Sequence, residues 1–535
     1  MRFKTLICTV LMLCLVLTAC GKGDAPSKDS SSNKSESATK SSRDYLTLLY
    51  SNADSFNPYT VKTDTNRQIV KLLYEPLVKV NDRFEAVNSV ASSVEVKGNV
   101  CTVSLKLIKF SDGTELTAED VVYSCELARN SETGYKDKLY EVQSVKADGK
   151  NVIFTLTKND PYFANVLDFP IIKKGSDKLT NSDSVSLPPI GCGRFKLNET
   201  LDGLVENKYY KGKIENIKKI KLINAPDTES VAHYTEIGAA DMYYTEISDG
   251  QITRMSGNRA EVNLNNLVYI GINQNYAPLN QANLRQAISS AVDRTKLCKT
   301  AYYNNALPAT GFFHPSWKET SSVQNLQINA NEEITVENLE EIGYNKLDGE
   351  GVRVNSNGTP LKFTLLVNSE NRIRVLAANT IASQLKAVGI SITVIERPYE
   401  QYLSALQSGS FQLYLGEIKL TDNMDISPLL TSGGSLGFGM PNIGATSTEG
   451  KEETDGETQE ETVTVSQRSS SETVLKEFYN SNATIKDVAA VLQTDMPVVP
   501  LCYRTGVLFY NKNIKNVKNS SSGDIYFSIE SYLIN

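Results

Sequence analysis

Between residues 361 and 394 the spacing of apolar side chains changes twice, and no other stretch constrains the fold as much. The alternation typical of a half-buried strand holds at Leu361, Phe363, Leu365 and Val367. A helical stripe follows at Ala378, Ile381, Leu385 and Val388. After Gly389 the alternation returns at Ile390, Ile392 and Val394. This order predicts a βαβ unit with parallel strands and a right-handed crossover, so this part of the chain is α/β.

Other periodic stretches extend this picture on both sides. Strands are expected at residues 45–50, 152–157 and 411–415, and helices at 67–74, 400–407 and 472–493. One face of a buried helix is predicted at Leu284, Ala287, Ile288, Ala291 and Val292. The glycines of the turn 189–195, Gly191 and Gly193, are expected to need positive φ.

Residues 101–128 combine a strand, a turn and a capped helix. Cys101, Val103, Leu105 and Leu107 alternate with polar positions, and Asp112-Gly113 supplies a turn. Thr117 precedes two acids, a pattern typical of a helix start, because a hydroxyl caps free N–H groups and carboxylates favour the positive end of the helix dipole.

The first 44 residues predict export and a lipid anchor. A basic start is followed by an apolar stretch, residues 6–17, that is too short to span a bilayer comfortably. The run Leu17-Thr18-Ala19-Cys20 is similar to a bacterial lipoprotein processing site, so we expect a signal peptide over residues 1–19 and lipidation of Cys20. The polar segment after Cys20 predicts a flexible tether over residues 20–44.

Charge is concentrated in one low-complexity segment. The formal net charge is −7, and residues 449–461 hold seven acids and one lysine, so the rest of the chain is nearly neutral. Neither a nucleic-acid surface nor a steering field for acidic substrates is indicated. Residues 444–471 lack the apolar side chains that a core requires and are expected to form a disordered insertion.

The cysteines and histidines of the sequence give no support for a metal site or a cofactor. Beyond Cys20 five cysteines remain, without CxxC spacing, and they are interpreted as buried small apolar residues, with one disulfide left open. The two histidines are far apart, so no metal site is predicted, and no cofactor is expected. The segment 345–351 is interpreted as a turn rather than a calcium loop. HExxH is absent, and the S-x-x-K match at residues 31–34 lies in the tether, so an enzyme is not expected.

Several ordered segments together resemble one family. They are the stretch FSDGTELTAEDVVYSCELA at 110–128, the Asn57-Pro58 turn, the run YEPL at 74–77, the turn PIGCGRF at 189–195, and the late run at 497–503. A further match contains Asn273, Arg285, Asp293 and Arg294, of which Arg285 and Asp293 are expected to form an internal ion pair. This series is similar to the extracellular solute-binding proteins of family 5, the oligopeptide- and dipeptide-binding lipoproteins of ABC importers.

The resemblance implies a two-lobe periplasmic-binding-protein-like α/β fold, type II and of the large peptide-binding subclass, with a hinge between the lobes. Lobe I would comprise residues 45–266 and the return at 504–535. Lobe II would comprise residues 267–503, including the insertion. A ligand in the cleft would stabilise closure by contacting both lobes.

The resemblance also suggests ligand-binding residues. Peptide-binding members hold the ligand's α-ammonium on an Asp, and Asp422 lies at that position, followed by Asn423. Weaker candidates for the cleft wall are Tyr59, Phe438 and Asn442. In dipeptide-binding members an Arg follows the strand at 361–367, whereas this chain has Asn368 to Asn371 there, with Arg372 and Arg374 slightly later.

The expected function is therefore capture of an oligopeptide or dipeptide on the outer face of the bacterial cytoplasmic membrane. Expected partners are the permease subunits of an ABC transporter, the membrane through the lipid anchor, and no nucleic acid; a monomer is expected. Alternatives are the same fold binding an oligosaccharide or a metal chelate, a secreted lipoprotein enzyme, and a surface lipoprotein that binds a partner.

The acidic composition generates a first prediction. Deleting residues 444–471 should leave the melting temperature nearly unchanged, because the segment carries almost no apolar surface to bury. Thermal unfolding of the full-length and deleted chains checks this. A large drop in the melting temperature would show that the segment packs against the folded part.

Overall fold

The computed structural model describes residues 43–247, 255–441 and 470–535. The segment expected to be a signal peptide, Cys20, Asn442 and most of the acidic segment therefore lie outside the described residues. Two large hydrophobic cores organise the described chain. The N-terminal core is built from residues before 263 and after 507, and the C-terminal core is built mainly from residues 267–507.

Two four-stranded sheets contribute side chains to the N-terminal core. The first has the order β1 (Tyr45–Tyr50), β10 (Lys219–Asn224), β9 (Gly203–Glu206) and β8 (Phe195–Leu197), with β1 and β10 parallel. The second is antiparallel, in the order β4 (Ala91–Lys97), β5 (Val100–Leu105), β7 (Asn151–Leu156) and β6 (Val142–Asp148). The helices of the N-terminal part of the chain are α1 (Asp64–Leu73), α2 (Ala118–Arg129), α3 (Tyr135–Lys138) and α4 (Thr228–Glu236).

Short elements complete this part of the chain. They are the hairpin β2 (Val78–Val80) and β3 (Ala86–Asn88), the 3-10 turns at Phe163–Val166, Ser176–Lys178 and Ile529–Ser531, and the pair β20 (Ile514–Lys515) and β21 (Leu533–Ile534). The predicted helix start at Thr117 is confirmed, since Thr117 and Asp120 form a capping box. The strand before it ends at Leu105, and Leu107, expected on its buried side, is exposed.

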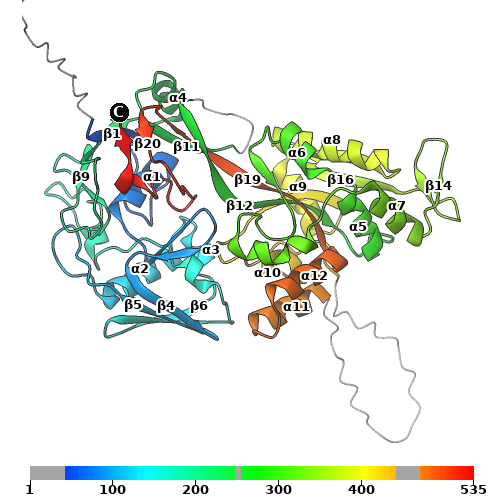
Figure 1. The fold of residues 1–535 in the computed structure, drawn as a ribbon, viewed down its shortest axis with the longest axis horizontal. Coiled ribbons are helices and arrows are strands. Elements are labelled where there is room, and N and C mark those ends of the chain that lie inside the picture. The colour runs from blue at the N-terminus through cyan, green and yellow to red at the C-terminus, as the bar shows by residue number, and fades with distance from the viewer. Residues whose placement is uncertain (1–42, 248–254, 442–469) are drawn as a thin grey trace, which may run out of the picture. The chain divides into compact units, whose positions relative to one another are not determined.

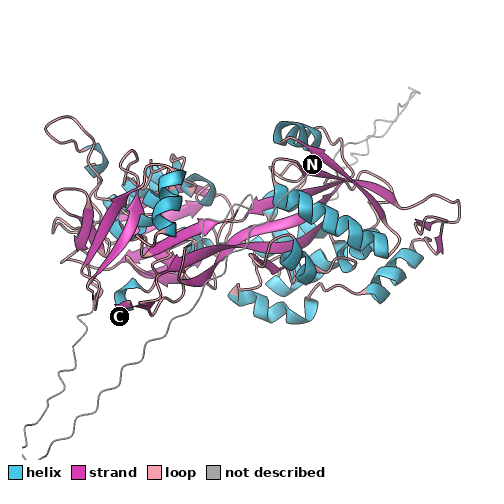
Figure 2. Cartoon of the chain, turned by 90° about the horizontal axis from the view of Figure 1, so that it is seen from above, coloured by secondary structure: helices cyan, strands magenta, loops and turns pink. Residues whose placement is uncertain are grey.

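The C-terminal core surrounds a sheet whose main path is β11 (Met242–Glu246), β19 (Val498–Tyr510), β12 (Asn258–Ile272), β18 (Leu413–Lys419), β16 (Lys362–Asn368) and β17 (Ser391–Arg397). Strand β13 (Ala306–Pro308) pairs with β19 off this path. Figure 2 shows the strands with helices packed against them. These helices are α5 (Ala282–Ser290), α6 (Arg294–Thr300), α7 (Glu332–Glu341), α8 (Arg372–Ala387), α9 (Tyr399–Gln407) and α10 (Ser427–Leu430).

The predicted βαβ unit with parallel strands is confirmed, and the handedness of its crossover stays a prediction. Strands β16 and β17 pair directly and in parallel, and α8 connects them in the sequence. Gly389 follows the helix with φ +86°, a left-handed conformation that glycine adopts at little cost. The segment 345–351 forms a turn between β14 (Lys346–Leu347) and β15 (Arg353–Val354), where two backbone N–H groups donate to Asp348. A 3-10 segment at Lys318–Leu326 lies earlier in the chain.

Three further local expectations were wrong. The single helix expected over residues 472–493 is two helices, α11 (Ser470–Tyr479) and α12 (Ile485–Asp495), because Ser481 turns with φ +61° and Thr484 caps the second helix. Helix α11 also includes the last two residues of the segment expected to be disordered, 470 and 471. Its buried Ser471 donates to Asp495, so a deletion that spares this helix stops at residue 469.

The turn glycines have a different role from the one expected. Neither Gly191 nor Gly193 has positive φ. Instead, a Cβ at Gly191 would lie 2.2 Å from the carbonyl oxygen of Leu73, and one at Gly193 would lie 2.3 Å from the carbonyl carbon of Leu73. These glycines therefore allow the end of α1 to pack against the turn.

The third expectation concerned an ion pair between Arg285 and Asp293. Arg285 does form an internal ion pair, but its partner is Asp495, 3.1 Å away in α12. Asp293 instead accepts a hydrogen bond from the backbone N–H of Lys296 and caps α6. The charge on Arg285 thus joins α5 to α12.

Strands β12 and β19 belong to both cores. They pair along most of their length (Figure 1), with the register shifting between Asn263 and Leu267. Val262 and Leu508 contribute to the N-terminal core, whereas Leu267 and Val507 contribute to the C-terminal core. The lobe boundaries expected at 266/267 and 503/504 remain a prediction.

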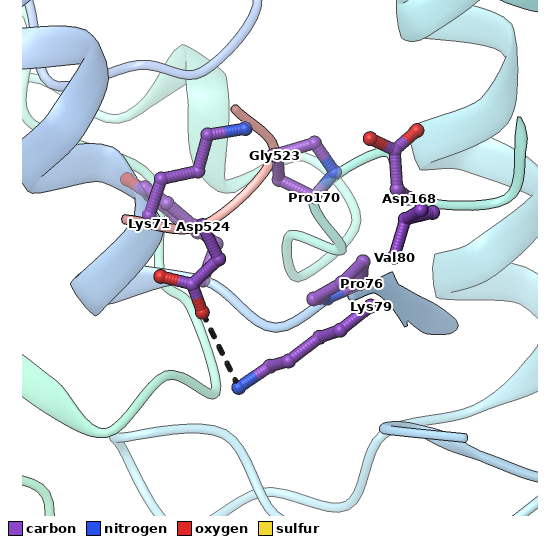
Figure 3. Close-up of a pocket in the computed structure, with 9 residues that line it drawn as sticks. Lys71, Pro76, Lys79, Val80, Asp168, Pro170, Gly523 and Asp524 are labelled. Atoms are coloured by element: carbon purple, nitrogen blue, oxygen red, sulfur yellow. Dashed lines mark ion pairs between the residues drawn. The ribbon is translucent and has the colours of Figure 1, made fainter. Parts of the chain in front are cut away.

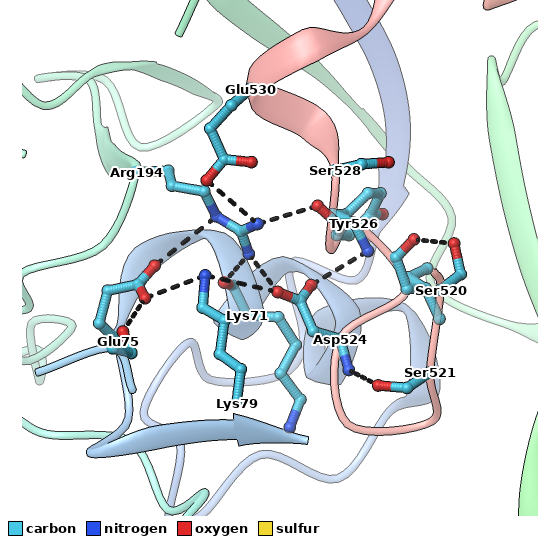
Figure 4. Close-up of polar contacts among 12 residues, drawn as sticks. Lys71, Glu75, Lys79, Arg194, Ser520, Ser521, Asp524, Tyr526, Ser528 and Glu530 are labelled. Carbon is cyan, nitrogen blue, oxygen red and sulfur yellow. Dashed lines mark hydrogen bonds and ion pairs between the residues drawn. The ribbon is translucent and has the colours of Figure 1, made fainter. Parts of the chain in front are cut away.

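A buried arginine fixes the end of the chain. Arg194 is fully buried; its guanidinium donates to Asp524 at 2.8 Å, to the carbonyl oxygen of Tyr526 at 2.9 Å and to that of Lys71 at 2.8 Å (Figure 4). The carboxylate of Glu75 lies 3.7 Å from it. These bonds tie the last residues to α1 and to the segment that follows it.

Replacing Arg194 should therefore destabilise the protein strongly. Arg194→Met leaves Asp524 and Glu75 buried with less compensation, and losing one partner of a buried ion pair typically costs about 3–5 kcal/mol. Equilibrium unfolding in urea checks this. The matched control is Arg67→Met, which removes a surface pair with Asp64 and should cost less than about 1 kcal/mol. Equal effects of the two changes would contradict the structural role of Arg194.

Candidate functional site

The segment 421–425 follows β18 and contacts residues of the N-terminal part of the chain. Leu420 donates its backbone N–H to the carbonyl oxygen of Asn265, which holds the segment beside β12. Met424 has φ +59°, so the backbone turns sharply between Asn423 and Asp425. Three polar side chains of this turn are buried: Asp422, Asn423 and Asp425. Buried polar groups are normally hydrogen-bonded, and the partners of these three come from other segments of the chain.

Asp422 shares a lysine with a second carboxylate. The ammonium of Lys138, at the end of α3, lies 2.7 Å from Oδ2 of Asp422 and 2.6 Å from Oδ2 of Asp168. Lys138 therefore joins the segment after β18 to the N-terminal part of the chain. Burial on its own would lower the pKa of Lys138, but the two carboxylates raise it well above its usual value, so this side chain stays charged.

The carboxylate of Asp425 accepts hydrogen bonds from several side chains. Lys158 lies 2.8 Å away, the Tyr479 hydroxyl donates at 2.7 Å, and the hydroxyl of Tyr140 also donates to it. Burial would raise the pKa of Asp425, but Lys158 and the hydrogen bonds lower it to about 2. The carboxylate is thus ionised at any physiological pH.

Asn423 contacts another buried acid. Its amide donates to Oδ2 of Asp160 at 2.7 Å, and the backbone N–H of Tyr162 donates to Oδ1. Burial raises the pKa of Asp160 to about 6, although these hydrogen bonds act against the increase. Nearby, the amide of Asn165 donates to the carbonyl oxygens of Phe84, at 2.8 Å, and of Asp422, at 3.0 Å.

Aromatic packing continues this contact. The ring of Tyr162 lies 5.0 Å from Trp317 and 6.3 Å from Phe478, measured between ring centroids. Phe84 packs against His314 at 4.7 Å. His314 is fully buried, and burial lowers its pKa to about 3, so it is a neutral packing residue here.

Two pockets adjoin these residues, and they share Val80 and Gly523. The first, called here the Lys71 pocket, is partly open to solvent, and Figure 3 shows the residues that line it. Its apolar wall consists of Tyr74, Pro76, Val80 and Pro170. Its charged side chains are Lys71, Lys79, Asp168 and Asp524. The second pocket is lined by Asp422, Asn263 and residues of the β2–β3 hairpin.

The structure brings together only part of the predicted site. Asp422 lines a pocket, and Asn423 is its buried neighbour. Tyr59 is buried in the N-terminal core, where its hydroxyl donates to the carbonyl oxygen of Pro170, and it lines neither of these two pockets. Phe438 packs against the C-terminal core, 6.3 Å from the ring of Tyr414. Asn442 lies outside the described residues.

Sequence reasoning missed Lys138, Asp168 and Lys71. Lys138 lies in a four-residue helix, and Asp168 follows a single 3-10 turn, so neither belongs to a periodic pattern. Lys71 occupies an ordinary polar position of α1. No local signal marks these residues, because their proximity arises only from the packing of distant segments.

The described residues contain free cysteines but no metal-ligand cluster and no helix suited to span a membrane. All five described cysteines are free and buried, as interpreted from the sequence. Within the described ranges, no three His, Cys, Asp or Glu side chains are grouped so as to hold a metal ion. In the same ranges, no helix combines the length and hydrophobicity needed to cross a bilayer.

Comparison with known proteins gives a consistent result. A family model for the bacterial extracellular solute-binding proteins, family 5, matches residues 85–436. The oligopeptide-binding protein AppA of Bacillus subtilis is 26% identical over 360 residues, which cover 63% of this chain and 66% of AppA. The glutathione-binding protein GsiB of Shigella flexneri is 25% identical over 296 residues, covering 52% of this chain and 57% of GsiB. The chain thus spans less than two thirds of these relatives' length.

Solved structures agree on the fold. The crystal structure of a nickel ABC transporter protein from Bacillus halodurans matches with a TM-score of 0.69 and 19% identity, covering 92% of this chain and 100% of the other. At this identity the likeness establishes the fold alone. The predicted α/β fold with two lobes is confirmed.

The buried Asp160 generates a pH prediction. Its pKa is higher in the folded protein than in the unfolded chain, so its contribution to stability is fully present below about pH 4 and is lost as the pH rises through about 6. The free energy of unfolding of the wild type, minus that of Asp160→Asn, should therefore fall by up to about 3 kcal/mol between pH 4 and pH 7. Urea unfolding at several pH values measures this difference. A difference that is flat with pH would contradict the raised pKa.

Proposed function

Because the chain belongs to the bacterial extracellular solute-binding proteins of family 5, we propose that it is the substrate-binding lipoprotein of an ABC importer. It captures peptides outside the cell and delivers them to a membrane permease. It binds its ligand without altering any covalent bond, so it is not an enzyme.

One observation carries this proposal beyond family membership. Lys138 connects Asp168 and Asp422, carboxylates from segments more than 250 residues apart, beside two pockets that share Gly523. A site at such a junction can bind a small solute through both parts of the chain, so that ligand binding stabilises one relative orientation. Charged groups there suit a ligand with charged ends.

The cell-surface location rests on the sequence. Lipidation of Cys20 would anchor the chain to the outer face of the cytoplasmic membrane, and the segment 20–44 would act as the tether. The partners would then be the permease subunits of the transporter, and the protein acts as a monomer.

The peptide need not be a dipeptide. Arg374, one of the two arginines near the position where dipeptide-binding members carry theirs, lies 2.8 Å from Glu417, and Glu417 also pairs with Arg504 at 2.8 Å. Because Arg374 is engaged in this cluster, longer peptides fit better than dipeptides. A metal chelate is the second candidate, since a matching structure is a nickel transporter protein.

Ligand capture tests the proposal directly. The purified chain is unfolded, freed of bound solute, refolded and incubated with a pool of linear peptides, and the retained species are identified by mass spectrometry. Selective retention of peptides with a dissociation constant in the micromolar range or below supports the function. Retention of a nickel chelate and no peptide would favour the second candidate, and retention of neither would reject both.

Asp422 provides a residue-level prediction. Asp422→Ala should lower the affinity for a peptide with a free amino terminus about tenfold or more, because a charge-assisted hydrogen bond is lost. The affinity for the same peptide with an acetylated amino terminus should change little. Calorimetric titration measures both, with exposed Asp137→Ala as the matched control. Equal losses for the two peptides would exclude Asp422 from recognition of the ammonium group.

A further inference from the structure

Most polar groups of the Lys71 pocket are already engaged by the protein. Asp524 accepts from Arg194 at 2.8 Å and from the backbone N–H of Tyr526 at 3.0 Å. Lys79 lies 3.0 Å from Glu75 and 3.7 Å from Asp524. The Tyr74 hydroxyl lies 3.0 Å from the carbonyl oxygen of Pro189 and 3.1 Å from that of Phe56. These groups belong to the framework and have little capacity left for a ligand.

Two polar atoms remain. Asp168 is 7% exposed; its Oδ2 accepts from Lys138, whereas its buried Oδ1 has no hydrogen-bond partner. Lys71 has no carboxylate within salt-bridge distance among the described residues, and its ammonium reaches only the Tyr135 hydroxyl, at 3.3 Å. In the view of Figure 3 the ends of Lys71 and Asp168 lie to either side of Pro170, away from the marked contact between Lys79 and Asp524. Figure 4 likewise shows the Lys71 ammonium without a marked contact to the residues drawn.

We propose that the Lys71 pocket binds a zwitterionic α-amino-carboxylate group of the ligand, with the ligand's ammonium on Oδ1 of Asp168 and its carboxylate on Lys71. The proposal rests on the proposed ligand-binding function and names the chemical class of one end of the ligand.

The charges favour a zwitterion over a simple ion. A buried acceptor without a partner costs free energy, and an ammonium group supplies the missing bond. A ligand with only an ammonium would also lie close to the Lys71 cation, and a ligand with only a carboxylate would lie close to Asp168. A group that carries both charges on one carbon satisfies both side chains. Burial lowers the pKa of Lys71, but Tyr135 and Asp168 raise it overall, so the cation is present at neutral pH.

Lys138 positions this acceptor. It holds Oδ2 of Asp168, a residue that lines the pocket, and is shared with Asp422, so the buried Oδ1 has no counter-ion of its own. Removing Asp422 would leave Lys138 to Asp168 alone and neutralise it further. Loss of affinity in Asp422→Ala is therefore compatible with either carboxylate as the direct partner, and variants of Asp168 and Lys71 are needed to separate the two.

The test compares two isomers of one tripeptide. In γ-glutamyl-alanyl-glycine the free ammonium and a carboxylate share one carbon, whereas in the α-linked isomer the ammonium is next to an amide. Calorimetric titration of the full-length chain should show the γ-linked isomer binding about tenfold tighter or more, and N-acetylation should abolish that advantage. Lys71→Met and Asp168→Asn should each remove the preference, while Lys136→Met and Asp137→Asn, at exposed positions of α3, should retain it.

Each outcome decides the proposal. Equal affinities for the two isomers, no binding of the γ-linked isomer, or a preference that survives in Lys71→Met or Asp168→Asn would overturn it. A preference that survives in these variants is expected if Lys71 and Asp168 pair with each other in solution, because neither side chain would then contact the ligand.

If linear peptides bind but the γ-linked isomer gains nothing, the inference fails and the peptide-binding function stands. If no peptide binds at all, the peptide-binding function fails with it. Melting temperatures near that of the wild type show that the variants are folded.

Discussion

The pairing of β12 with β19 is the interaction on which the rest of the structure depends. The two strands run antiparallel and contribute side chains to both hydrophobic cores, so each core is completed only when they pair. Their ladder shifts register between Asn263 and Leu267 and again between Val268 and Tyr269. A β-bulge bends a strand and increases its local twist, so the ladder can bend most easily at these two positions.

Beyond this ladder, the contacts between the two parts combine charged pairs with aromatic packing, such as that of Tyr162 against Trp317 and Phe478. Lys138 and Lys158 from the N-terminal part meet Asp422 and Asp425, while Asn423 meets Asp160. Removing such groups from water costs almost as much as their attraction returns, so they specify an orientation without contributing much net stability. An arrangement of this kind leaves a ligand able to decide the equilibrium between orientations. A purely apolar contact would instead hold the two parts together with or without ligand.

The pattern of apolar residues predicted elements well and partners poorly. It located β16, α8 and β17, because one buried face imposes a period of two on a strand and about 3.6 on a helix. It merged α11 and α12, because a short break at Ser481 hardly disturbs an amphipathic stripe. The partner of Arg285 was missed because Asp495 lies 210 residues away, and periodicity carries no information about such distances.

The sequence by itself determined that this chain forms an α/β protein of family 5, and it pointed to Asp422 through local order and a recognisable series of segments. Only the tertiary structure decided which charges lie together. Lys71, Asp168 and Lys138 come from separate segments, and their mutual positions follow from how α1, α3 and the segment around Asp168 pack together. The reason is physical: periodicity reports which face of an element is buried, whereas electrostatic pairing depends on distances that exist only after the chain has packed.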